Sequence, residues 1–390
     1  MRLCPLKDIQ KDMILGKSIY LLNGKLLLGA GTSITEQLKN KLQKRGYTYI
    51  YIIEEGTDDV IPEEVVSDEV SFSAKNQLAK IIYDIQNETE FKNASVTKAM
   101  DLIEQGYLQD ALVSLNMRSM IEEVLKDIIS SGSKILNSVM IKTADSFFLD
   151  HALNVTVLTL LIGMKYRFSK KELLDLGVGS FLHDIGKIVI EQINEKDDPA
   201  ITEKLYPEHP MLGYKILAHA PIISTLESVI ACQHHERQDG KGFPMGLKGQ
   251  NLPPVKNAVR KTKGYIFRLA EICSVANSYD NIAYNPKMPD ITHPVDAIKQ
   301  IINDASTKHN KEIVQTLITI VPYYPVGAAV KLVYIWDQSL IGHTGVVAKI
   351  HEDNINKPVI ILTKNKYNKK IKSIVIDTAT VSNIELQLLL

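Results

Sequence analysis

Histidines recur along the middle of the chain at intervals that suit a bundle of helices. In chain order they are His151, His183, His209 and the adjacent pair His234 and His235. Because each successive helix of a bundle can turn one ligand inward, this spacing predicts imidazoles that meet in one interior. The carboxylate of Asp184 follows the second histidine directly. Four or five imidazoles with one carboxylate form a ligand set for a first-row transition metal, and a carboxylate can bridge two ions.

The His-Asp pair is predicted to end a buried helix that spans 172–187. An apolar run, from Leu173 to Leu182, buries this helix and would fix His183 and Asp184 in place. A pair that only caps the helix and forms hydrogen bonds is the alternative. Lys187 lies on the same helical face and is predicted to offset negative charge on a phosphate, unless it is simply a solvated lysine.

The segment around His151 shows why that side chain should point into a core. Val155, Leu158 and Ile162 follow it on one helical face at intervals of four, three and four. A buried histidine bound only to a backbone group is the alternative, and the other histidine positions favour a ligand. The remaining five histidines follow no such pattern and are interpreted as surface or packing residues: His219, His293, His309, His343 and His351.

The residues around these histidines resemble the motifs of the HD-GYP phosphohydrolases. His183–Lys187 is similar to the first signature of that family, and 234–244, with its Asp-Gly-Lys-Gly-Phe-Pro ending, is similar to the second. His209–Gly213 and His151–Val155 resemble the segments between and before them. The resemblance covers residues 140 to 325. It implies a mainly α, helical HD-type bundle with a two- or three-metal centre that hydrolyses cyclic di-GMP.

The resemblance also implies a division of the ligands between two metal ions. Asp184 would bridge the ions and, with Lys187, take the catalytic roles. One ion would be held by His151, His183, Asp184 and Asn277, and the other by His209, His234, His235 and Asp184. Iron or manganese suits such histidine-rich coordination best, and zinc is the alternative.

Asn277 departs from the family pattern, which has a metal-binding aspartate at this position. An amide oxygen can coordinate a metal but brings no negative charge, so the first metal should bind more weakly. Asp280, one helical turn further on, matches a second family position and would partly compensate. Phe147 stands where a few relatives supply a glutamate for a third metal, so two metals are the expected maximum.

Other departures concern the substrate side of the site. Asn285–Pro289 replaces an arginine-bearing segment, which removes an expected phosphate contact. Phe243 replaces the usual tyrosine and would form an apolar wall beside the metals. About 14 residues at 253–266 are inserted relative to the family. Their basic residues are expected to be either a solvated loop or a further grip on phosphates.

Two functional hypotheses follow from the motifs and their departures. The first is a metal-dependent phosphodiesterase acting on cyclic di-GMP or a related cyclic dinucleotide. The alternative is a catalytically degenerate cyclic-dinucleotide receptor or signalling adaptor, which Asn277 and the missing arginines favour. The expected partner is the cyclic dinucleotide, with a homodimer or a regulatory protein left open.

Composition limits the other classes of function. The 45 basic and 45 acidic residues balance, so no global field would attract DNA, RNA or a membrane. Only three cysteines occur, which favours a reducing compartment. No signal peptide and no apolar run of about 18 residues is recognised, so a cytoplasmic protein is expected.

The chain is predicted to divide into five regions. An α+β module over 1–55 would contain a hairpin turning at Asn23 and Gly24, and a helix over 33–45 opened by a capping box of Ser33 and Glu36. The other regions are a solvated acidic linker over 56–70, a helical connector over 71–140, the catalytic domain over 141–322 and a small β region over 323–390.

Overall fold

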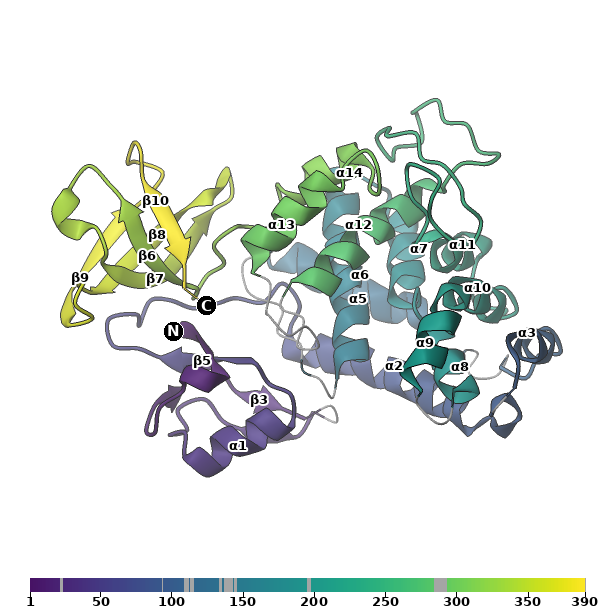
Figure 1. Cartoon of the computed structure of the whole chain (residues 1–390), viewed down its shortest axis with the longest axis horizontal. Coiled ribbons are helices and arrows are strands. Elements are labelled where there is room, and N and C mark those ends of the chain that lie inside the picture. The colour runs from purple at the N-terminus through teal and green to yellow at the C-terminus, as the bar shows by residue number, and fades with distance from the viewer. Residues whose placement is uncertain are drawn as a thin grey trace.

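The middle of the chain forms a helical bundle, and β structure forms toward both ends of the chain. In Figure 1 the two β regions lie on the same side of the bundle. A computed structural model describes residues 1–390 except 22–23, 93, 109–111, 113–115, 133–134, 137–142, 144–145, 195–197, 284–292 and 390. The predicted fold class, a mainly α bundle with a small α+β module before it and a small β region after it, is confirmed.

The N-terminal module combines two small antiparallel sheets with one helix. Its larger sheet has the order β1 (Arg2–Pro5), β5 (Tyr49–Ile53) and β2 (Ile14–Leu15). The predicted hairpin is present as β3 (Ile19–Tyr20) paired with β4 (Leu26–Leu28). Of its turn, Gly24 has φ +76°, and Asn23 lies outside the described residues. The short 3-10 turn η1 (Leu6–Asp8) follows β1.

The helix of this module, α1 (Glu36–Lys44), begins later than predicted. Thr35 is its N-cap, and the Thr35 hydroxyl accepts a hydrogen bond from the backbone N–H of Leu38 at 3.3 Å. The predicted capping box of Ser33 and Glu36 is therefore wrong. Ser33 instead forms a β-bridge with Ile14, so its backbone is already committed to pairing before the helix starts.

The acidic segment that follows β5 is packed against the rest of the protein. Val60 is fully buried in the core of the C-terminal sheet, while Val65 and Val66 belong to the core of the bundle. Glu54 pairs with both Arg2 and Lys364. The prediction of a solvated linker is therefore wrong for these residues, because apolar side chains between the acidic ones anchor the segment.

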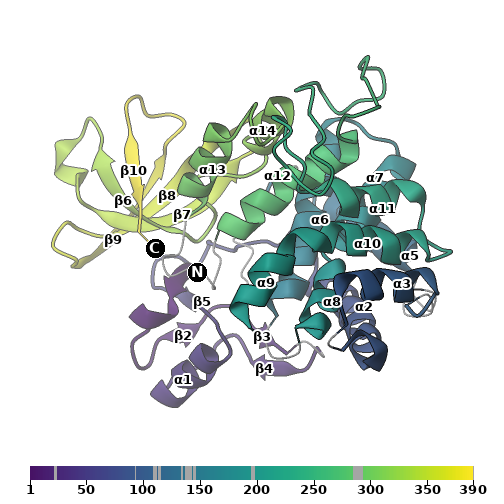
Figure 2. The same cartoon turned by 45° about the vertical axis from the view of Figure 1, so that its right-hand side comes forward.

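The bundle comprises the following helices, most of which are visible in the two views of Figures 1 and 2. They are α2 (Asp68–Asn87), α3 (Val96–Glu104), α5 (Met117–Ser130), α6 (Phe147–Lys165), α7 (Lys170–Phe181), α8 (Gly186–Ile193), α9 (Pro199–Leu205), α10 (His209–Ala218), α11 (Thr225–Gln233), α12 (Arg268–Ile282), α13 (Pro294–Asn303) and α14 (Lys311–Leu317). Two 3-10 turns, η2 (Thr89–Phe91) and η3 (Tyr206–Glu208), lie between them.

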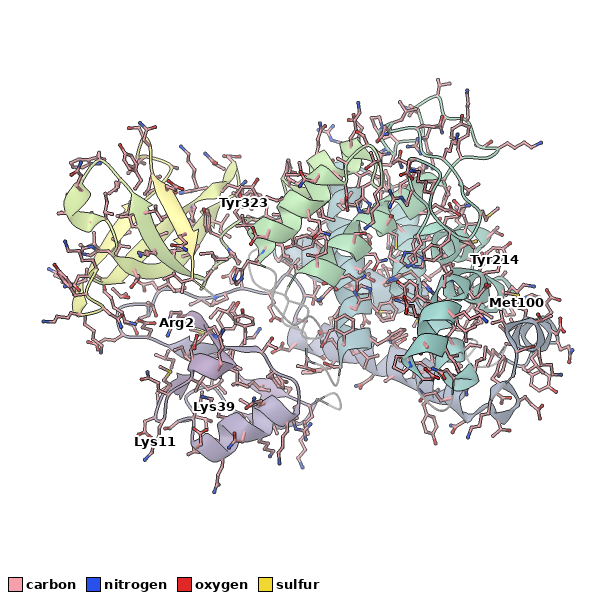
Figure 3. The ribbon with its side chains drawn as sticks, in the orientation of Figure 1. Arg2, Lys11, Lys39, Met100, Tyr214 and Tyr323 are labelled. Carbon is pink, nitrogen blue, oxygen red and sulfur yellow. The ribbon has the colours of Figure 1, made fainter. Side chains whose placement is uncertain are left out.

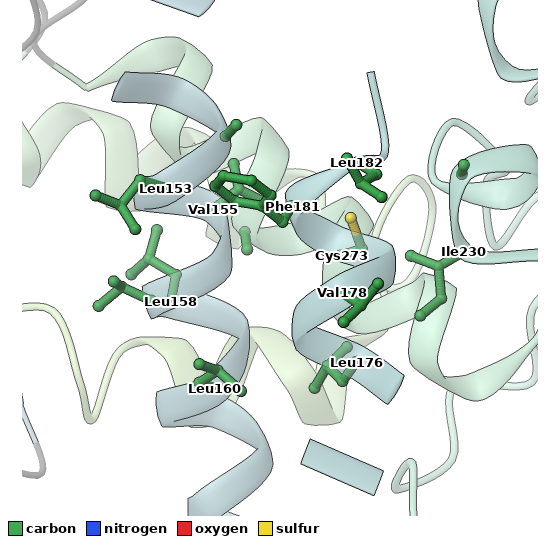
Figure 4. Close-up of a cluster of buried hydrophobic side chains, with 14 of the residues drawn as sticks. Leu153, Val155, Leu158, Leu160, Leu176, Val178, Phe181, Leu182, Ile230 and Cys273 are labelled. Atoms are coloured by element: carbon green, nitrogen blue, oxygen red, sulfur yellow. The ribbon is translucent and has the colours of Figure 1, made fainter. Parts of the chain in front are cut away.

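Helix α6 is the centre of the bundle and is apolar on nearly all sides. It is long and apolar enough to cross a membrane, but 83% of its most apolar window is buried inside the protein. A helix that is hydrophobic all round and covered by other helices is a core helix. Figure 4 shows part of this core, in which Leu158 of α6, Val178 of α7 and Ile230 of α11 are labelled.

Two of the packed helices are opened by capping boxes. The Ser169 hydroxyl and the Glu172 carboxylate satisfy each other's backbone N–H groups at the start of α7. Ser224 and Glu227 do the same for α11. These reciprocal hydrogen bonds fix where each helix begins. They therefore also fix the positions of the histidines that follow the two helices.

The C-terminal region is one antiparallel sheet of five strands. Its order is β10 (Glu385–Leu388), β6 (Ala329–Tyr334), β7 (Thr344–His351), β8 (Asn354–Lys364) and β9 (Lys370–Asp377), with the 3-10 turn η4 (Gln338–Leu340) between β6 and β7. Tyr323, labelled in Figure 3, joins this sheet to the bundle, since its backbone N–H donates to Asn356 Oδ1 at 3.0 Å. The Leu3 N–H donates to the Gly327 carbonyl at 2.7 Å, so β1 lies beside the start of this region.

Two arginines of the basic insert and its flank are tied to carboxylates of the bundle. Arg260 donates to Glu271 at 2.7 Å, and both side chains are nearly buried. Arg268 donates to Glu172 at 2.6 Å. These two guanidiniums therefore hold the insert against α12 and α7, which makes the phosphate-gripping interpretation unsuitable for them.

We predict that Arg260→Met destabilises the protein by about 3 kcal/mol, because it leaves the buried Glu271 carboxylate without its cation. Urea unfolding monitored by circular dichroism measures this change. Lys263→Met in the same insert is the matched control, since Lys263 is exposed and a surface change should stay within about 0.5 kcal/mol. Equal stability of the two variants would contradict a supporting role for the Arg260 ion pair.

Candidate metal centre

A tight turn between α7 and α8 places His183 and Asp184 in the interior. Gly186 opens α8 where that helix meets the start of α10, and a Cβ atom at this position would lie 2.1 Å from the His209 carbonyl oxygen. Only glycine permits so close an approach of two backbones. The turn therefore brings His183 and Asp184 next to His209, although the two segments are separated in the sequence.

The structure brings six of the seven predicted ligands into two adjoining groups. Asp184 belongs to both groups, and within each group the ligand atoms lie within 4.8 Å of one another. One group contains His151, His183 and Asp184, and the other contains Asp184, His209, His234 and His235. We call these six residues the histidine cluster. Of the six, only His235 is partly exposed.

The two carboxylate oxygens of Asp184 face the two groups separately. Oδ1 lies 3.3 Å from His209 Nε2 and 3.4 Å from His234 Nε2. Oδ2 lies 3.4 Å from His183 Nε2 and 3.6 Å from His151 Nε2. A carboxylate arranged in this way can offer one oxygen to each of two ions.

Three imidazoles have their tautomer fixed by the backbone. The Nδ1 atoms of His183, His209 and His234 lie 2.7, 2.6 and 2.8 Å from carbonyl oxygens. Because a carbonyl oxygen only accepts hydrogen bonds, each Nδ1 carries the proton and each Nε2 presents a lone pair.

These lone pairs converge without protein donors to satisfy them. The Nε2 atoms of His209 and His234 are 3.2 Å apart, a spacing at which two lone pairs repel unless a cation or proton lies between them. Two nitrogens bound to one metal at about 2.1 Å are separated by roughly 3 Å. Among the described residues, the buried Nε2 atoms of His151 and His183 and the Oδ1 atom of Asp184 have no hydrogen-bond partner. The histidine cluster therefore fits divalent metal ions.

Burial sets the charge of the cluster. It lowers the pKa of His234 to about 3 and that of His235 well below its ordinary value. Burial alone would raise the pKa of Asp184, but His183 and Lys187 hold that pKa well below its usual range. His234 and His235 are thus neutral imidazoles beside an ionised Asp184 carboxylate, which are the protonation states that bind metals.

Comparison with known proteins agrees with this geometry. Residues 123–256 match the profile of the family described as HD domain. This part of the chain is similar to HD domains. The resemblance to HD-type phosphohydrolases found in the sequence is confirmed. The matched residues contain all six members of the histidine cluster.

Curated relatives with similar sequences are cyclic di-GMP phosphodiesterases. One from Pseudomonas aeruginosa is 22% identical over 66% of this chain and 58% of its own length. Another from Borreliella burgdorferi is 24% identical over 56% of this chain and 53% of its own length. The chain thus spans little more than half the length of these relatives. Among solved structures, the HDG"Y"P protein of Bdellovibrio bacteriovorus has a TM-score of 0.42 at 17% identity, covering 81% of this chain and 97% of its own.

Lys187 contacts the Asp184 carboxylate directly. Its Nζ donates to Asp184 Oδ2 at 2.5 Å and lies 5.3 Å from the centre of the Tyr206 ring. Burial would lower the pKa of Lys187, but the Asp184 carboxylate raises it above its ordinary value. Lys187 is therefore a fixed cation beside the cluster. Its catalytic role stays a prediction.

Asn277, the seventh predicted ligand, is buried on α12. Its Oδ1 accepts a hydrogen bond from Asn281 Nδ2 at 2.5 Å. The oxygen expected to bind metal is thus engaged by a neighbouring side chain one helical turn away. Its role as a metal ligand stays a prediction.

Asp280 contacts a member of the histidine cluster, His151. His151 Nδ1 lies 2.7 Å from Asp280 Oδ2, and Asn154 Nδ2 donates to Asp280 Oδ1 at 3.1 Å. The sequence pointed to Asp280 as a compensating charge near the metal, and the structure places it on the far nitrogen of His151. A carboxylate there orients the ring and raises its basicity as a ligand.

We predict that Asp280→Asn weakens metal binding at the His151 group by about 10- to 100-fold, since it removes the carboxylate that orients His151. Metal titration by calorimetry should show a second, weaker step, while the group that contains His234 keeps its affinity. Asp296→Asn is the control, because Asp296 is exposed on α13. Two unchanged binding steps in Asp280→Asn would contradict the positioning role.

Tyr206 is a site residue that sequence reasoning missed. Its hydroxyl lies 3.3 Å from His235 Nε2, and its ring centre is 4.8 Å from that of His209. Phe243 stacks on His235 with ring centres 4.6 Å apart, in keeping with the predicted apolar wall. The only signal for Tyr206 in the sequence was its position three residues before His209. That position alone does not distinguish a site residue from any other tyrosine.

Glu236 holds the glycine-rich loop that carries Phe243. Its carboxylate accepts from the backbone N–H groups of Met245 and Leu247, each at 2.7 Å. This buried anchor explains why the loop keeps Phe243 against His235. Sequence reasoning missed Glu236 because it stands beside the histidine pair, and its own role was not separated from theirs.

Two further predicted features concern the edge of the site. Phe147 stacks on His151 with ring centres 5.9 Å apart, so it offers a face and no ligand atom. The substituted segment Asn285–Pro289 lies outside the described residues.

Proposed function

We propose that this protein is a metal-dependent phosphodiesterase that hydrolyses cyclic di-GMP or a related cyclic dinucleotide in cytoplasmic second-messenger signalling. The observation that carries the proposal is the Asp184 carboxylate, whose two oxygens face two separate groups of imidazoles. The activity of the curated relatives supports the choice of substrate.

The proposed ligands are His151, His183, Asp184 and Asn277 for one ion, and Asp184, His209, His234 and His235 for the other. Two iron or manganese ions suit this donor set best, with zinc as the alternative. Such ions would supply Lewis acidity toward the phosphate and a water of lowered pKa. Lys187 would donate a hydrogen bond to a phosphate oxygen, where its fixed positive charge offsets charge that develops during the reaction.

The apolar wall would orient the substrate and limit the access of water. Phe243 and Tyr206 stand beside His235, the partly exposed member of the cluster, and their ring centres are 6.1 Å apart. Flat rings at the entrance suit the stacking of a guanine base. The Tyr206 hydroxyl lies 3.3 Å from His235 Nε2, so it can donate a hydrogen bond to a phosphate that binds beside His235.

The test is hydrolysis of cyclic di-GMP by protein purified anaerobically and loaded with Fe²⁺ or Mn²⁺. Chromatography should show the linear dinucleotide and then GMP appearing with time, and cyclic di-AMP measured in parallel gives the selectivity. Absence of product from fully metallated protein would overturn the enzymatic proposal.

A catalytically degenerate receptor or signalling adaptor is the second candidate, and the engaged Asn277 amide favours it. A receptor would bind cyclic di-GMP with saturation in calorimetry while the same metallated sample releases no product. Binding accompanied by turnover would exclude a pure receptor. A homodimer or a regulatory partner is compatible with either candidate.

A further inference from the structure

A cavity lies between the N-terminal module and helices α2 and α6, with a volume of about 480 Å³. None of the residues that line it belongs to the histidine cluster. Its volume is within the range of pockets that bind small molecules, roughly 300 to 1,000 Å³. The cavity is therefore large enough for a ligand of its own, separate from the proposed substrate.

One wall of this cavity is aromatic. Tyr20 of β3 and Phe72 of α2 meet edge to face with ring centres 5.3 Å apart. Tyr47 and Tyr49, which stand before and at the start of β5, also line the space. Aromatic side chains contributed by several elements form flat surfaces against which a planar ring can pack.

The ion pairs at the cavity leave over two of its charged lining residues, Arg45 and Asp68. Lys17 is paired with Glu64, and Lys75 is paired with Asp150 at 2.6 Å. Arg45 also lines the cavity, and no carboxylate within the described ranges lies at ion-pair distance from it. A guanidinium presents a planar fork of donors that matches a carboxylate or a phosphate.

We propose that this cavity binds a small planar aromatic molecule that carries one anionic group, either a carboxylate or a phosphate monoester. Arg45 holds the anionic group, and the ring packs against Tyr20 and Phe72. The proposal does not depend on the function proposed for the histidine cluster, because it concerns different residues and a different ligand.

The floor of the cavity is connected to the histidine cluster through α6. Asp150 lines the cavity and accepts hydrogen bonds from Ser146 Oγ and, at 3.3 Å, from the Thr143 N–H. The next residue, His151, is a member of the cluster. A ligand that contacts the Lys75–Asp150 pair therefore contacts the first turn of the helix that supplies His151.

The experiment measures binding to the full chain with two probes, 4-hydroxybenzoate for the carboxylate and GMP for the phosphate. Chelator is present so that GMP has no metal to bind. Calorimetry and saturation-transfer NMR should show saturable binding of at least one probe, and the probe that binds identifies the anionic group. Phenol, which lacks the charge, should bind at least about tenfold more weakly.

Arg45→Gln should weaken binding of the probe about tenfold or more, since a hydrogen bond to a charged group is lost. Lys44→Gln, at the neighbouring exposed position of α1, should leave binding unchanged. Ser71→Trp, which fills the cavity from α2, should abolish binding, and circular dichroism checks that each variant is folded. Hydrogen exchange should also slow over Phe147–His151 when the probe is bound.

Three results would overturn the proposal. They are the absence of saturable binding by both probes, an unchanged affinity in Arg45→Gln, and binding of phenol as tight as that of 4-hydroxybenzoate. Unchanged hydrogen exchange over the first turn of α6 would overturn the connection to the cluster.

Discussion

Asp184→Ala is expected to remove both metal ions and to lower hydrolysis of cyclic di-GMP by far more than 100-fold. Loss of a supporting group at a metal site alone costs about 10- to 100-fold, and Asp184 belongs to both groups of the cluster. The substitution also leaves several imidazole lone pairs facing one another without an anion. Elemental analysis and a turnover assay on the same preparation measure the two effects.

His219→Ala is the matched control for this experiment. His219 is an exposed histidine at the end of α10, the helix that His209 begins, and it lies outside the cluster. Its loss should change neither metal content nor turnover. If Asp184→Ala kept one tightly bound ion, the shared-ligand arrangement would be wrong even if activity were lost.

Asn277→Asp is expected to lower the melting temperature without metal and to raise it with metal. The new carboxylate would be buried, so without metal it should lower the melting temperature. With metal it should tighten binding by about 10- to 100-fold and raise the melting temperature, because one more negative charge faces the first ion. Calorimetric metal titration and thermal unfolding in the presence and absence of chelator measure both effects.

The same variant separates the two proposed functions. In a weakened phosphodiesterase, Asn277→Asp should raise hydrolysis of cyclic di-GMP by about one or two orders of magnitude. In a receptor, it should tighten metal binding while turnover stays at background. Asn303→Asp, which adds the same charge at the exposed end of α13, is the control. An equal gain in metal affinity in both variants would argue against Asn277 as a ligand.

The residues of the site that could be predicted from the sequence are those that short, local patterns identify. His183 and Asp184 follow an unbroken apolar helix, and the other histidines recur once per helix, so their convergence follows from bundle packing. The β-hairpin and the C-terminal strands were predictable for the same reason, since alternation and turn residues are local signals.

What could not be predicted depends on contacts between distant segments. Asp280 meets His151 across 129 positions of the sequence, and nothing in the neighbourhood of either residue announces the other. The predicted capping box of α1 was wrong because Ser33 forms a β-bridge with Ile14, a contact that the local motif does not reveal. The prediction of a solvated acidic linker was wrong because it relied on the acidic residues alone. Val60, which stands between them, is buried.

The hydrogen bond between Leu3 and Gly327 affects the order in which parts of the protein can fold during translation. The first strand leaves the ribosome early, yet the carbonyl that its Leu3 N–H requires is made 324 residues later. Val60 likewise becomes buried only after the C-terminal sheet has been synthesised and has folded. Because domains usually fold from the N-terminus as they emerge, this module must stay incomplete while the whole bundle is translated, with an apolar side chain exposed until the chain closes on itself.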